Sequence, residues 1–570
     1  MRSFVRVLLL VLLAGLVLNW LFAARGPDVA DGSVLVLDVG GEYVEAPEPP
    51  LIARLLGGTK TPLLRLYSQL RKAERDPRLH AVVLRIGPSR MGWAKAQEVR
   101  DALLRLREAG KKTVAYVEVE PIGANAEYYM ASAAETIWVS PGTRIPFVGL
   151  AAEYLFLGGF FEKLGVEIEV ERVGPHKTAA DFLAGRSMSE PARDMANWLL
   201  DSIDDQFVGG IAEARGLEEA DLRRFIAQSP ASPDELIAAG LVDKMGFLSD
   251  VLDDLGAERT VIESDEWALV EPFGDFEPQA IVALVYGSGN VVTGDADRTR
   301  RGDPVLAGRA VARNIEEAAE DDSVAAILFR IDSPGGSALA SDAVWHATQL
   351  AREKKPLVVS FSDVAASGGY YVACGADAIY SQPGTITGSI GVVMMRPVLS
   401  GLYEKLGIGF EVLTRGDNAR LFTLSQTLDA EDRKRLGDEV EGTYQLFLDR
   451  VEAGRGMDRG AIDAVGRGRV WTGAQAWEHG LVDELGGIYA AVAGLREKLG
   501  LDPDADVALT VYPPPASLPE QLAGMLQGAV ARAVGPELPL PGAARTAIAW
   551  LEGIPVGAPA LLPPLAVEIR

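Results

Sequence analysis

The chain has 570 residues, of which 48% are hydrophobic and 24% charged, so it is long enough for two or more domains and too apolar for a disordered protein. Its net charge of −25 excludes nucleic acid as the expected partner, because so acidic a protein cannot neutralise a phosphate backbone. The single cysteine, Cys374, excludes an intrachain disulfide, so packing alone must stabilise the fold.

The first feature along the chain is an apolar run at residues 7–24, preceded by two arginines. A run of this length is about the minimum that spans a bilayer, and the arginines predict a cytoplasmic amino terminus and an exported body. A cleaved signal peptide is the alternative. Cleavage after Ala23 or Ala24 would place Leu21 or Phe22 where a small residue is needed, so we expect a retained single-pass membrane anchor.

The rest of the chain contains an internal repeat. Three stretches of the first half recur in the second, two at an offset of 242 residues and one at 240: 127–137 with 369–379, 161–170 with 403–412, and 239–243 with 479–483. Such matches indicate a duplicated domain. The predicted organisation is an anchor at 1–26, a first repeat at 27–270, a second repeat at 271–509, and a Pro-rich tail at 510–570.

Within each repeat, apolar β-branched runs alternate with helical patterns. The predicted strands are 33–38, 80–86 and 113–117 in the first repeat and 280–286, 324–331 and 357–361 in the second; the predicted helices are 94–109, 190–214, 341–354 and 430–453. This alternation predicts an α/β fold with largely parallel sheets and right-handed crossovers.

Ser367 lies where the strand at 357–361 leads into the start of a helix. Free backbone N–H groups and the helix dipole favour a developing negative charge at such a position. The glycines that follow, beginning with Gly368, would let a substrate backbone approach closely. The alternative interpretation is a capping serine at a tightly packed strand–helix junction.

A comparison of the two repeats links Ser367 to a lysine. Asn125 stands opposite Ser367, and Ala419 stands opposite Lys177. Complementary loss of this kind is expected if a serine and a lysine once cooperated in each copy and one composite site remains. Apolar neighbours such as Phe182 could desolvate Lys177 and keep its amine neutral, as a general base requires. A solvated surface lysine is the alternative.

An acyl-transfer site also needs donors for an oxyanion, and the turn Ser333-Pro334-Gly335-Gly336 can supply them. We expect the N–H groups of Gly336 and Gly368 to serve. The corresponding stretch of the first repeat, residues 87–90, lacks the paired glycines.

Histidine is the competing base. His176 neighbours Lys177 and is the one serious rival, whereas His80, His346 and His479 have structural surroundings. The sequence has no Cys/His cluster, no H-E-x-x-H, no P-loop and no G-x-G-x-x-G after a strand, so we expect neither a metal nor another cofactor.

Together, Asp-Ser-Pro-Gly-Gly at 332–336, Ala-Ala-Ser-Gly-Gly-Tyr-Tyr at 365–371, Ile-Thr-Gly-Ser-Ile-Gly at 386–391 and Gly-Pro-His-Lys at 174–177 resemble the signal peptide peptidase A (protease IV) family, in its long, duplicated, membrane-anchored form. The resemblance covers roughly residues 33–500 and implies tandem Clp/crotonase-like domains. It implies Ser367 as nucleophile, Lys177 as general base, Ser389 as the residue that orients the lysine, and Gly335–Gly336 as part of the oxyanion hole. Asp332 is a departure, because asparagine is frequent there.

The same resemblance implies a homo-oligomeric bowl, a tetramer in the duplicated form, on the outer face of a bacterial inner membrane. Its substrates would be unfolded apolar peptides, chiefly released signal peptides. Two other functions remain open: a crotonase-like enzyme that acts on acyl thioesters through the same glycine amides, and a non-catalytic membrane scaffold.

Overall fold

The structure is a computed structural model that describes residues 27, 29–46, 61–119, 124–229, 232–256, 260–274, 276–295, 304–416 and 418–514, with the backbone of 560–561 and 568–569. The predicted anchor and most of the Pro-rich tail lie outside these residues. No helix in the described part of the chain is long and apolar enough to cross a membrane.

The first half forms a parallel six-stranded sheet in the order β10-β1-β4-β5-β6-β9. Its strands are β1 (Ser33–Gly41), β4 (Leu79–Ser89), β5 (Lys112–Val117), β6 (Thr136–Val139), β9 (Lys244–Met245) and β10 (Val261–Glu263). β1 is buried on both faces: Leu35 and Leu37 join the largest core, whereas Val34 and Val36 pack toward Val251 on the other face. Burial on both faces explains why these strands are nearly continuous apolar runs.

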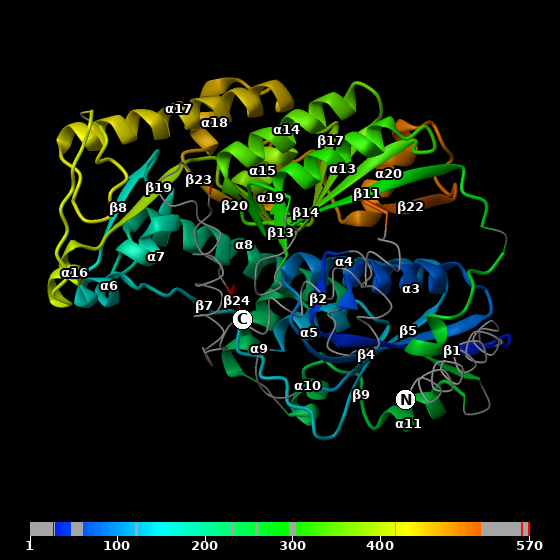
Figure 1. Cartoon of the computed structure of the whole chain (residues 1–570). Helices are drawn as coiled ribbons and strands as arrows, with labels where there is room; N and C mark the ends of the chain where they lie inside the picture. The colour runs from blue at the N-terminus through cyan, green and yellow to red at the C-terminus, as the bar shows by residue number, and fades with distance from the viewer. Residues whose placement is uncertain are drawn as a thin grey trace, which may run out of the picture.

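Helices surround this first sheet. They are α3 (Leu63–Arg75), α4 (Trp93–Glu108), α5 (Asn125–Ala131), α8 (Glu190–Arg215), α9 (Glu219–Gln228), α10 (Pro233–Ala238), α11 (Leu248–Asp254) and α12 (Ser264–Trp267), with a small ladder of β2 (Tyr43–Val44) and β3 (Thr61–Pro62). α3 and α4 lie between the sheets of the two halves (Figure 1). Leu66 of α3 and Leu103 of α4 share one core with Leu328 and Val358 of the second half, so the two halves are joined by apolar packing.

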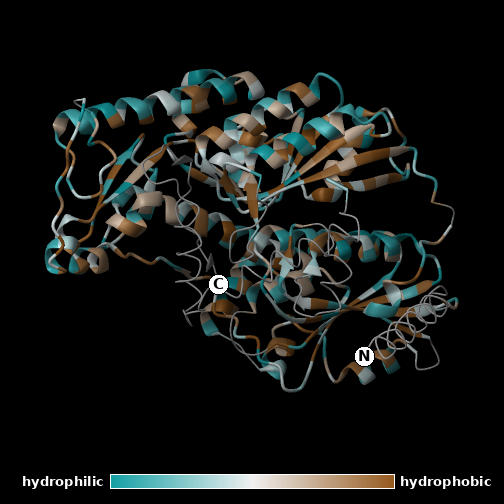
Figure 2. Ribbon diagram, in the orientation of Figure 1, coloured by the Kyte–Doolittle hydropathy of each residue, from teal (hydrophilic) through white to brown (hydrophobic). Residues whose placement is uncertain are grey.

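The second half forms a sheet in the order β20-β18-β16-β14-β11-β22. β17 also pairs with β16, and β21 pairs with β17; only β18 and β20 pair antiparallel among the described strands of this sheet. Its strands are β11 (Ala280–Ser288), β14 (Ala326–Ser333), β16 (Leu357–Ala366), β17 (Ala378–Ser381), β18 (Ile386–Gly388), β20 (Val470–Thr472), β21 (Glu484–Leu485) and β22 (Val507–Tyr512). Its helices are α13 (Gly308–Glu320), α14 (Ala338–Arg352), α15 (Gly368–Ala373), α17 (Ala430–Arg455), α18 (Arg459–Val465), α19 (Gly473–Glu478) and α20 (Ile488–Lys498). The strands are hydrophobic, and the outer helices carry hydrophilic residues on the solvent side (Figure 2).

The predicted α/β class with parallel sheets is confirmed, and several predicted element bounds differ by a few residues. β16 continues beyond residue 361 to Ala366, because β18 pairs with residues 364–366. α14 begins at Ala338, where the Ser337 hydroxyl accepts a hydrogen bond from the Ala340 N–H. β22, a strand not predicted from the sequence, pairs with β11 from Val507 to Tyr512.

A third sheet joins the halves in the order β13-β12-β15-β23-β19-β8. Its strands are β8 (Glu167–Arg172), β12 (Asn290–Val292), β13 (Val305–Ala307), β15 (Gly336–Ser337), β19 (Val393–Val398) and β23 (Ala560–Leu561). β8 comes from the first half and pairs antiparallel with β19 of the second. Together with α6 (Gly158–Leu164), η1 (Thr178–Ala180), α7 (Asp181–Ala184) and α16 (Ser400–Lys405), this pair forms an arm at the left of Figure 1. Because β8 pairs with β19, the residues that follow β8 lie against the second half.

Candidate active site

Ser367 occupies the junction between β16 and α15 in a strained backbone conformation. Its φ of 55° and ψ of −111° lie in a region that residues other than glycine rarely adopt. Two backbone hydrogen bonds hold it there: the Ser367 N–H donates to Gly388 O at 2.8 Å, and its carbonyl accepts from the Tyr371 N–H at 2.8 Å. These two hydrogen bonds therefore fix the Ser367 backbone and the direction in which its side chain leaves it.

Lys177 follows β8 and reaches this serine from the other half. Its Nζ lies 2.7 Å from Ser367 Oγ, 2.9 Å from Ser389 O and 3.0 Å from Ser389 Oγ. All three residues are fully buried, and burial lowers the pKa of Lys177 well below its usual value. A neutral amine has two N–H donors and one lone pair. With both donors directed at Ser389, the lone pair is available to accept the Ser367 hydroxyl proton.

Two glycines of the second half make room for the lysine, and the sequence assigned this role to neither of them. A Cβ at Gly468, whose φ is 84°, would lie 2.3 Å from Lys177 N, and one at Gly391 would lie 3.2 Å from Lys177 Cδ. Gly391 ends the Ile-Thr-Gly-Ser-Ile-Gly motif, and Gly468 ends a Gly-Arg-Gly triplet at 466–468. The triplet was the available signal, but nothing in the sequence connects it with Lys177.

The predicted oxyanion turn lies beside the start of α15. Gly335 and Gly336 have φ values of 99° and 154°, which favour glycine. The Gly335 N–H donates to Ser333 Oγ at 3.2 Å, so this amide is already used within the turn. A Cβ at Gly368 would lie 3.0 Å from Gly336 N, which places Gly368 and Gly336 against one another. Gly335 thus shapes the turn, while Gly336 and Gly368 have the placement expected of a donor pair.

The equivalent position in the first half is filled differently. Asn125 begins α5 and its side-chain amide donates to Gly149 O at 3.1 Å. Glu127, which aligns with Gly369 of the second half, accepts a hydrogen bond from the Ser89 N–H at 2.8 Å. A carboxylate therefore binds an amide of the turn in the first half.

His176 lies next to Lys177 in sequence but faces another way. Its ring is 5.7 Å from the Trp198 ring, and partial burial together with Arg469 lowers its pKa. The group in contact with Ser367 is the Lys177 amine. Of the other histidines, His479 packs 4.3 Å from the Trp471 ring, His80 lies in β4 and His346 lies in α14. Among the residues that the structure describes, no group of three His, Cys, Asp or Glu could hold a metal ion.

The family model described as Peptidase family S49 matches residues 105–261 and 349–502, more than half of the chain. The chain belongs to peptidase family S49. This S49 peptidase is 34% identical to "Serine protease SPPA, chloroplastic" of Arabidopsis thaliana, over 89% of this chain and 75% of that protein. It is 29% identical to "Protease 4" of Haemophilus influenzae, over 74% and 71%. It is 35% identical to "Putative signal peptide peptidase SppA" of Enterococcus faecium, over 31% and 52%.

The resemblance to protease IV is therefore confirmed, and the S49 chain is a serine peptidase. The two matched regions fall one in each predicted repeat. The boundaries of the repeats and the Clp/crotonase-like label remain predictions.

Proposed function

We propose that this S49 peptidase cleaves peptide bonds through an acyl-enzyme, with Ser367 as nucleophile and Lys177 as general base. The 2.7 Å contact between Lys177 Nζ and Ser367 Oγ is the observation that carries the proposal. A hydrogen bond of this length between a serine and a desolvated lysine meets the geometric requirement for proton transfer. Each residue comes from the half that lacks the other.

The reaction then has two steps. Ser367 Oγ attacks the substrate carbonyl while its proton passes to Lys177 Nζ, and the N–H groups of Gly336 and Gly368 bind the oxyanion. Lys177 returns the proton to the amine of the leaving peptide as the C–N bond breaks. A water molecule then loses a proton to Lys177 and attacks the acyl carbon. Lys177 returns that proton to Ser367 Oγ as the acyl C–O bond breaks, which releases the acid product and restores the serine hydroxyl. Ser389 keeps the amine aimed at the serine throughout, because it accepts both of its N–H bonds.

The substrate would bind as an extended strand. β15, which contains Gly336, and β19 flank a position in the third sheet that the backbone of residues 560–561 occupies. A strand of another peptide could form the same backbone hydrogen bonds beside the oxyanion turn. Unfolded apolar peptides, including released signal peptides, suit this arrangement. The name of the Enterococcus faecium relative, "Putative signal peptide peptidase SppA", supports this choice.

The experiment that tests the proposal combines labelling with hydrolysis. The full-length protein in detergent is incubated with a serine-reactive acylating probe, and the labelled peptide is identified by mass spectrometry. We expect the label on Ser367, together with cleavage of a signal-peptide sequence. Lys177→Ala should abolish both and His176→Ala should retain both. Activity in Lys177→Ala would refute the dyad.

We also propose that the chain forms a homo-oligomer through the segments that are the repeat equivalents of β8 and β19. In the β8–β19 register, Pro397 pairs with Ile168. The repeat offset of 242 maps β19 onto residues 151–156 and β8 onto 409–414, so the equivalent pair is Leu155 and Phe410. In the described chain, residues 409–414 form no strand, and β7 (Ala152–Glu153) pairs with the two-residue β24 (Glu568–Ile569) of the tail.

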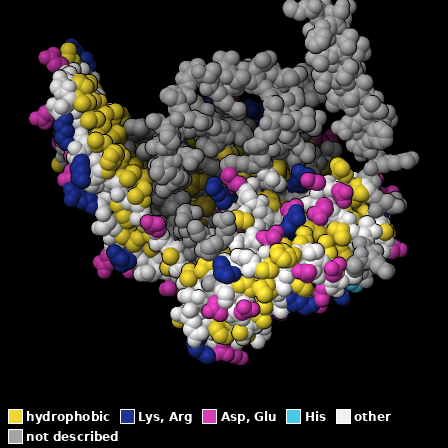
Figure 3. Space-filling model, turned by 90° about the horizontal axis from the view of Figure 1, so that it is seen from below, with side chains coloured by type: hydrophobic (Ala, Val, Ile, Leu, Met, Phe, Trp, Pro, Cys, Tyr) yellow, Lys and Arg dark blue, Asp and Glu magenta, His cyan; other side chains and the backbone are white. Residues whose placement is uncertain are grey.

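These two segments are exposed and apolar. Leu155 is 48% exposed, Phe410 55% and Leu413 89%, and hydrophobic side chains gather along the arm in Figure 3. Exposure on this scale indicates an interface. Pairing of 409–414 in one copy with 151–156 in the next is a head-to-tail contact, which must close into a ring or grow into a filament. A tetrameric ring is the closed form that the protease IV resemblance implies.

Cysteine cross-linking tests this contact. Two differently tagged chains, Leu155→Cys and Phe410→Cys, are mixed and oxidised; the register places these residues opposite one another, and native Cys374 is buried. A cross-linked product with both tags is expected. Leu155→Cys mixed with Phe247→Cys is the control, because Phe247 is at least as exposed as Phe410 but lies outside the contact. Equal cross-linking in the two mixtures would contradict the contact, and mass photometry gives the number of subunits.

The cellular location that we propose rests on the amino-terminal apolar run. The apolar run at 7–24 behind two arginines would anchor the chain once in the membrane, with its amino terminus cytoplasmic and the catalytic body extracytoplasmic. Protease added to the outside of unlysed spheroplasts should digest the catalytic body. Digestion only after lysis would exclude this orientation.

A further inference from the structure

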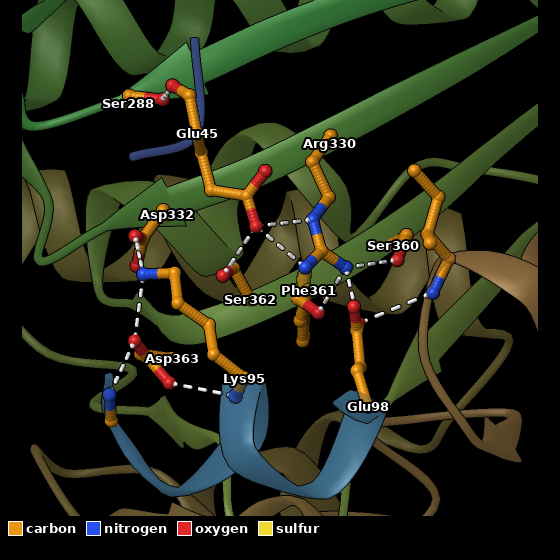
Figure 4. A network of polar contacts seen from close by, with 12 residues as sticks. Glu45, Lys95, Glu98, Ser288, Arg330, Asp332, Ser360, Phe361, Ser362 and Asp363 are labelled. Carbon is orange, nitrogen blue, oxygen red and sulfur yellow. Dashed lines mark hydrogen bonds and ion pairs between the residues drawn. The ribbon is translucent and has the colours of Figure 1, made fainter. Parts of the chain in front are cut away.

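A buried polar network joins the two halves behind the active site (Figure 4). Lys95, on the first turn of α4, projects from the first half into the second. Its Nζ lies 2.7 Å from Asp332 Oδ2 and 2.7 Å from Asp363 Oδ2, and the residue is only 6% exposed. Asp332 immediately precedes the Ser-Pro-Gly-Gly turn, and Asp363 lies four residues before Ser367 on β16. One lysine thus contacts both segments that lead into the site.

We infer that Lys95 is a positioning residue, which holds the oxyanion turn and the nucleophile strand in register by neutralising Asp332 and Asp363. The inference rests on the proposed roles of Ser367, Gly336 and Gly368. Lys95 itself contacts neither substrate nor reacting atoms, and it acts only through the two aspartates.

Both aspartates make further bonds that transmit the position of α4. Asp363 accepts from the backbone N–H groups of Gly92 at 3.2 Å and Lys95 at 3.1 Å, so it serves as the N-cap that Gly92 lacks. A Cβ at Gly92 would lie 2.4 Å from Asp363 Cγ, which shows how closely the two halves meet. Asp332 Oδ1 accepts from the Val364 N–H at 3.2 Å and so ties the end of β14 to β16.

A second ion-pair cluster restrains the same two strands one step further from the site. Arg330 of β14, fully buried, donates to Glu98 of α4 at 2.7 Å and to Glu45 at 2.6 Å. It also donates to Ser360 Oγ at 2.7 Å, and Ser362 Oγ donates to Glu45 at 2.8 Å. β14 and β16 therefore remain bound to the first half through Arg330, Ser360 and Ser362 when Lys95 is replaced. Loss of Lys95 should disturb the ends of the strands rather than the whole interface.

The charge of Lys95 is what matters. Burial alone would lower its pKa, but the carboxylates of Asp332, Asp363 and Glu45 together raise the pKa above its usual value, so the side chain is an ammonium. Without it, two carboxylates would face one another in a largely buried space, and their repulsion would push the turn away from the nucleophile strand. Movement of the turn displaces Gly336 N relative to Gly368 N. Transition-state binding should suffer more than substrate binding.

The decisive variant is Lys95→Met in the full-length protein. We expect kcat to fall roughly 10- to 100-fold with KM little changed, which is the scale for misplacement or partial loss of an oxyanion donor. A peptide aldehyde, which adds to Ser367 Oγ and places its oxygen in the oxyanion site, should bind more weakly by a similar factor. The matching peptide alcohol, which forms no adduct, should bind as it does to the unchanged protein. A lower aldehyde-to-alcohol affinity ratio is the signature of the positioning role.

Lys111→Met is the matched control. Lys111 is also a buried lysine, but its amine donates to the backbone carbonyls of Asp76 and Leu79 within the first half. Its removal should lower the unfolding temperature without changing kcat or the aldehyde-to-alcohol ratio. If Lys95→Met behaves like Lys111→Met, Lys95 is merely structural and the inference fails.

A double variant tests the charge argument. Asp332→Asn added to Lys95→Met removes one of the two facing carboxylates and should recover most of the lost kcat and of the aldehyde affinity. Absence of recovery would refute repulsion as the cause. If Lys95→Met does not fold, Asp363→Asn breaks the same link from the other side, and an unchanged aldehyde-to-alcohol ratio there overturns the inference. If the protein without any substitution cleaves no peptide, the proposed function itself is refuted. Failure of the proposed function can thus be told apart from failure of the inference about Lys95.

Discussion

Gly468 lies so close to Lys177 that a Cβ at this glycine would be 2.3 Å from the lysine amide nitrogen and 2.5 Å from its Cα. Backbone of the second half therefore fixes the backbone of the lysine, which belongs to the first. Contact at this distance leaves no room for any other residue at position 468.

Gly468→Ala should consequently displace Lys177 and lower kcat by roughly 100-fold, the scale expected when a catalytic group moves by about 1 Å. Peptide hydrolysis by the purified full-length protein measures the loss. Gly500→Ala is the control, because Gly500 also has a positive φ, 66°, but nothing lies within 4 Å of its Cβ position. An equal loss of activity in both variants would attribute the effect to backbone strain instead of to the lysine.

The pH dependence of activity should follow Lys177. Burial lowers its pKa, so the amine is protonated below that value and cannot take the serine proton. We expect kcat/KM to rise with pH through the lowered pKa and to level off well below pH 10. His176→Ala should leave the profile unchanged. A rising limb that disappears in His176→Ala would assign the base to the histidine.

Lys177 should also make the folded state sensitive to pH. The unfolded chain binds a proton on this lysine up to pH about 10.4 and the folded chain releases it at a lower pH, so stability is lost as pH falls. Between the two values, the stability of Lys177→Met relative to the unchanged protein should grow by about 1.4 kcal/mol for each unit that pH decreases. Unfolding temperatures of both proteins across this range measure the difference. A pH-independent difference would show that Lys177 stays charged when buried.

The sequence could predict the pairing of Lys177 with Ser367 because a duplicated chain records which residue each copy has lost. Asn125 and Ala419 mark the two losses, and the 242-residue offset connects them without any knowledge of the fold. The parallel sheets could also be predicted from the sequence, because their strands are continuous apolar runs. β1, which is buried on both faces, is an example.

The connection between the halves was not predictable in the same way. β8 and β19 pair antiparallel across more than 220 residues of sequence, and neither strand has a pattern that specifies its partner. In the sequence, nothing distinguishes Lys95, Asp332 and Asp363 from ordinary charged surface residues. Only the packing of α4 against the second sheet buries them together. Partner choice and burial of charge are set by tertiary contacts rather than by local sequence.

The backbone strain at Ser367 leads to the last prediction. Its φ of 55° and ψ of −111° are unfavourable for any residue with a Cβ, and such strain is worth about 1–3 kcal/mol. Ser367→Gly should therefore be inactive yet more stable than the unchanged protein, whereas Ser367→Ala should be inactive without that gain. Thermal unfolding of the three proteins at one pH gives the comparison. If the glycine variant unfolds at or below the temperature of the alanine variant, the backbone hydrogen bonds of Ser367 with Gly388 O and the Tyr371 N–H do not hold it against a strain. The serine is then oriented by its contact with Lys177 alone.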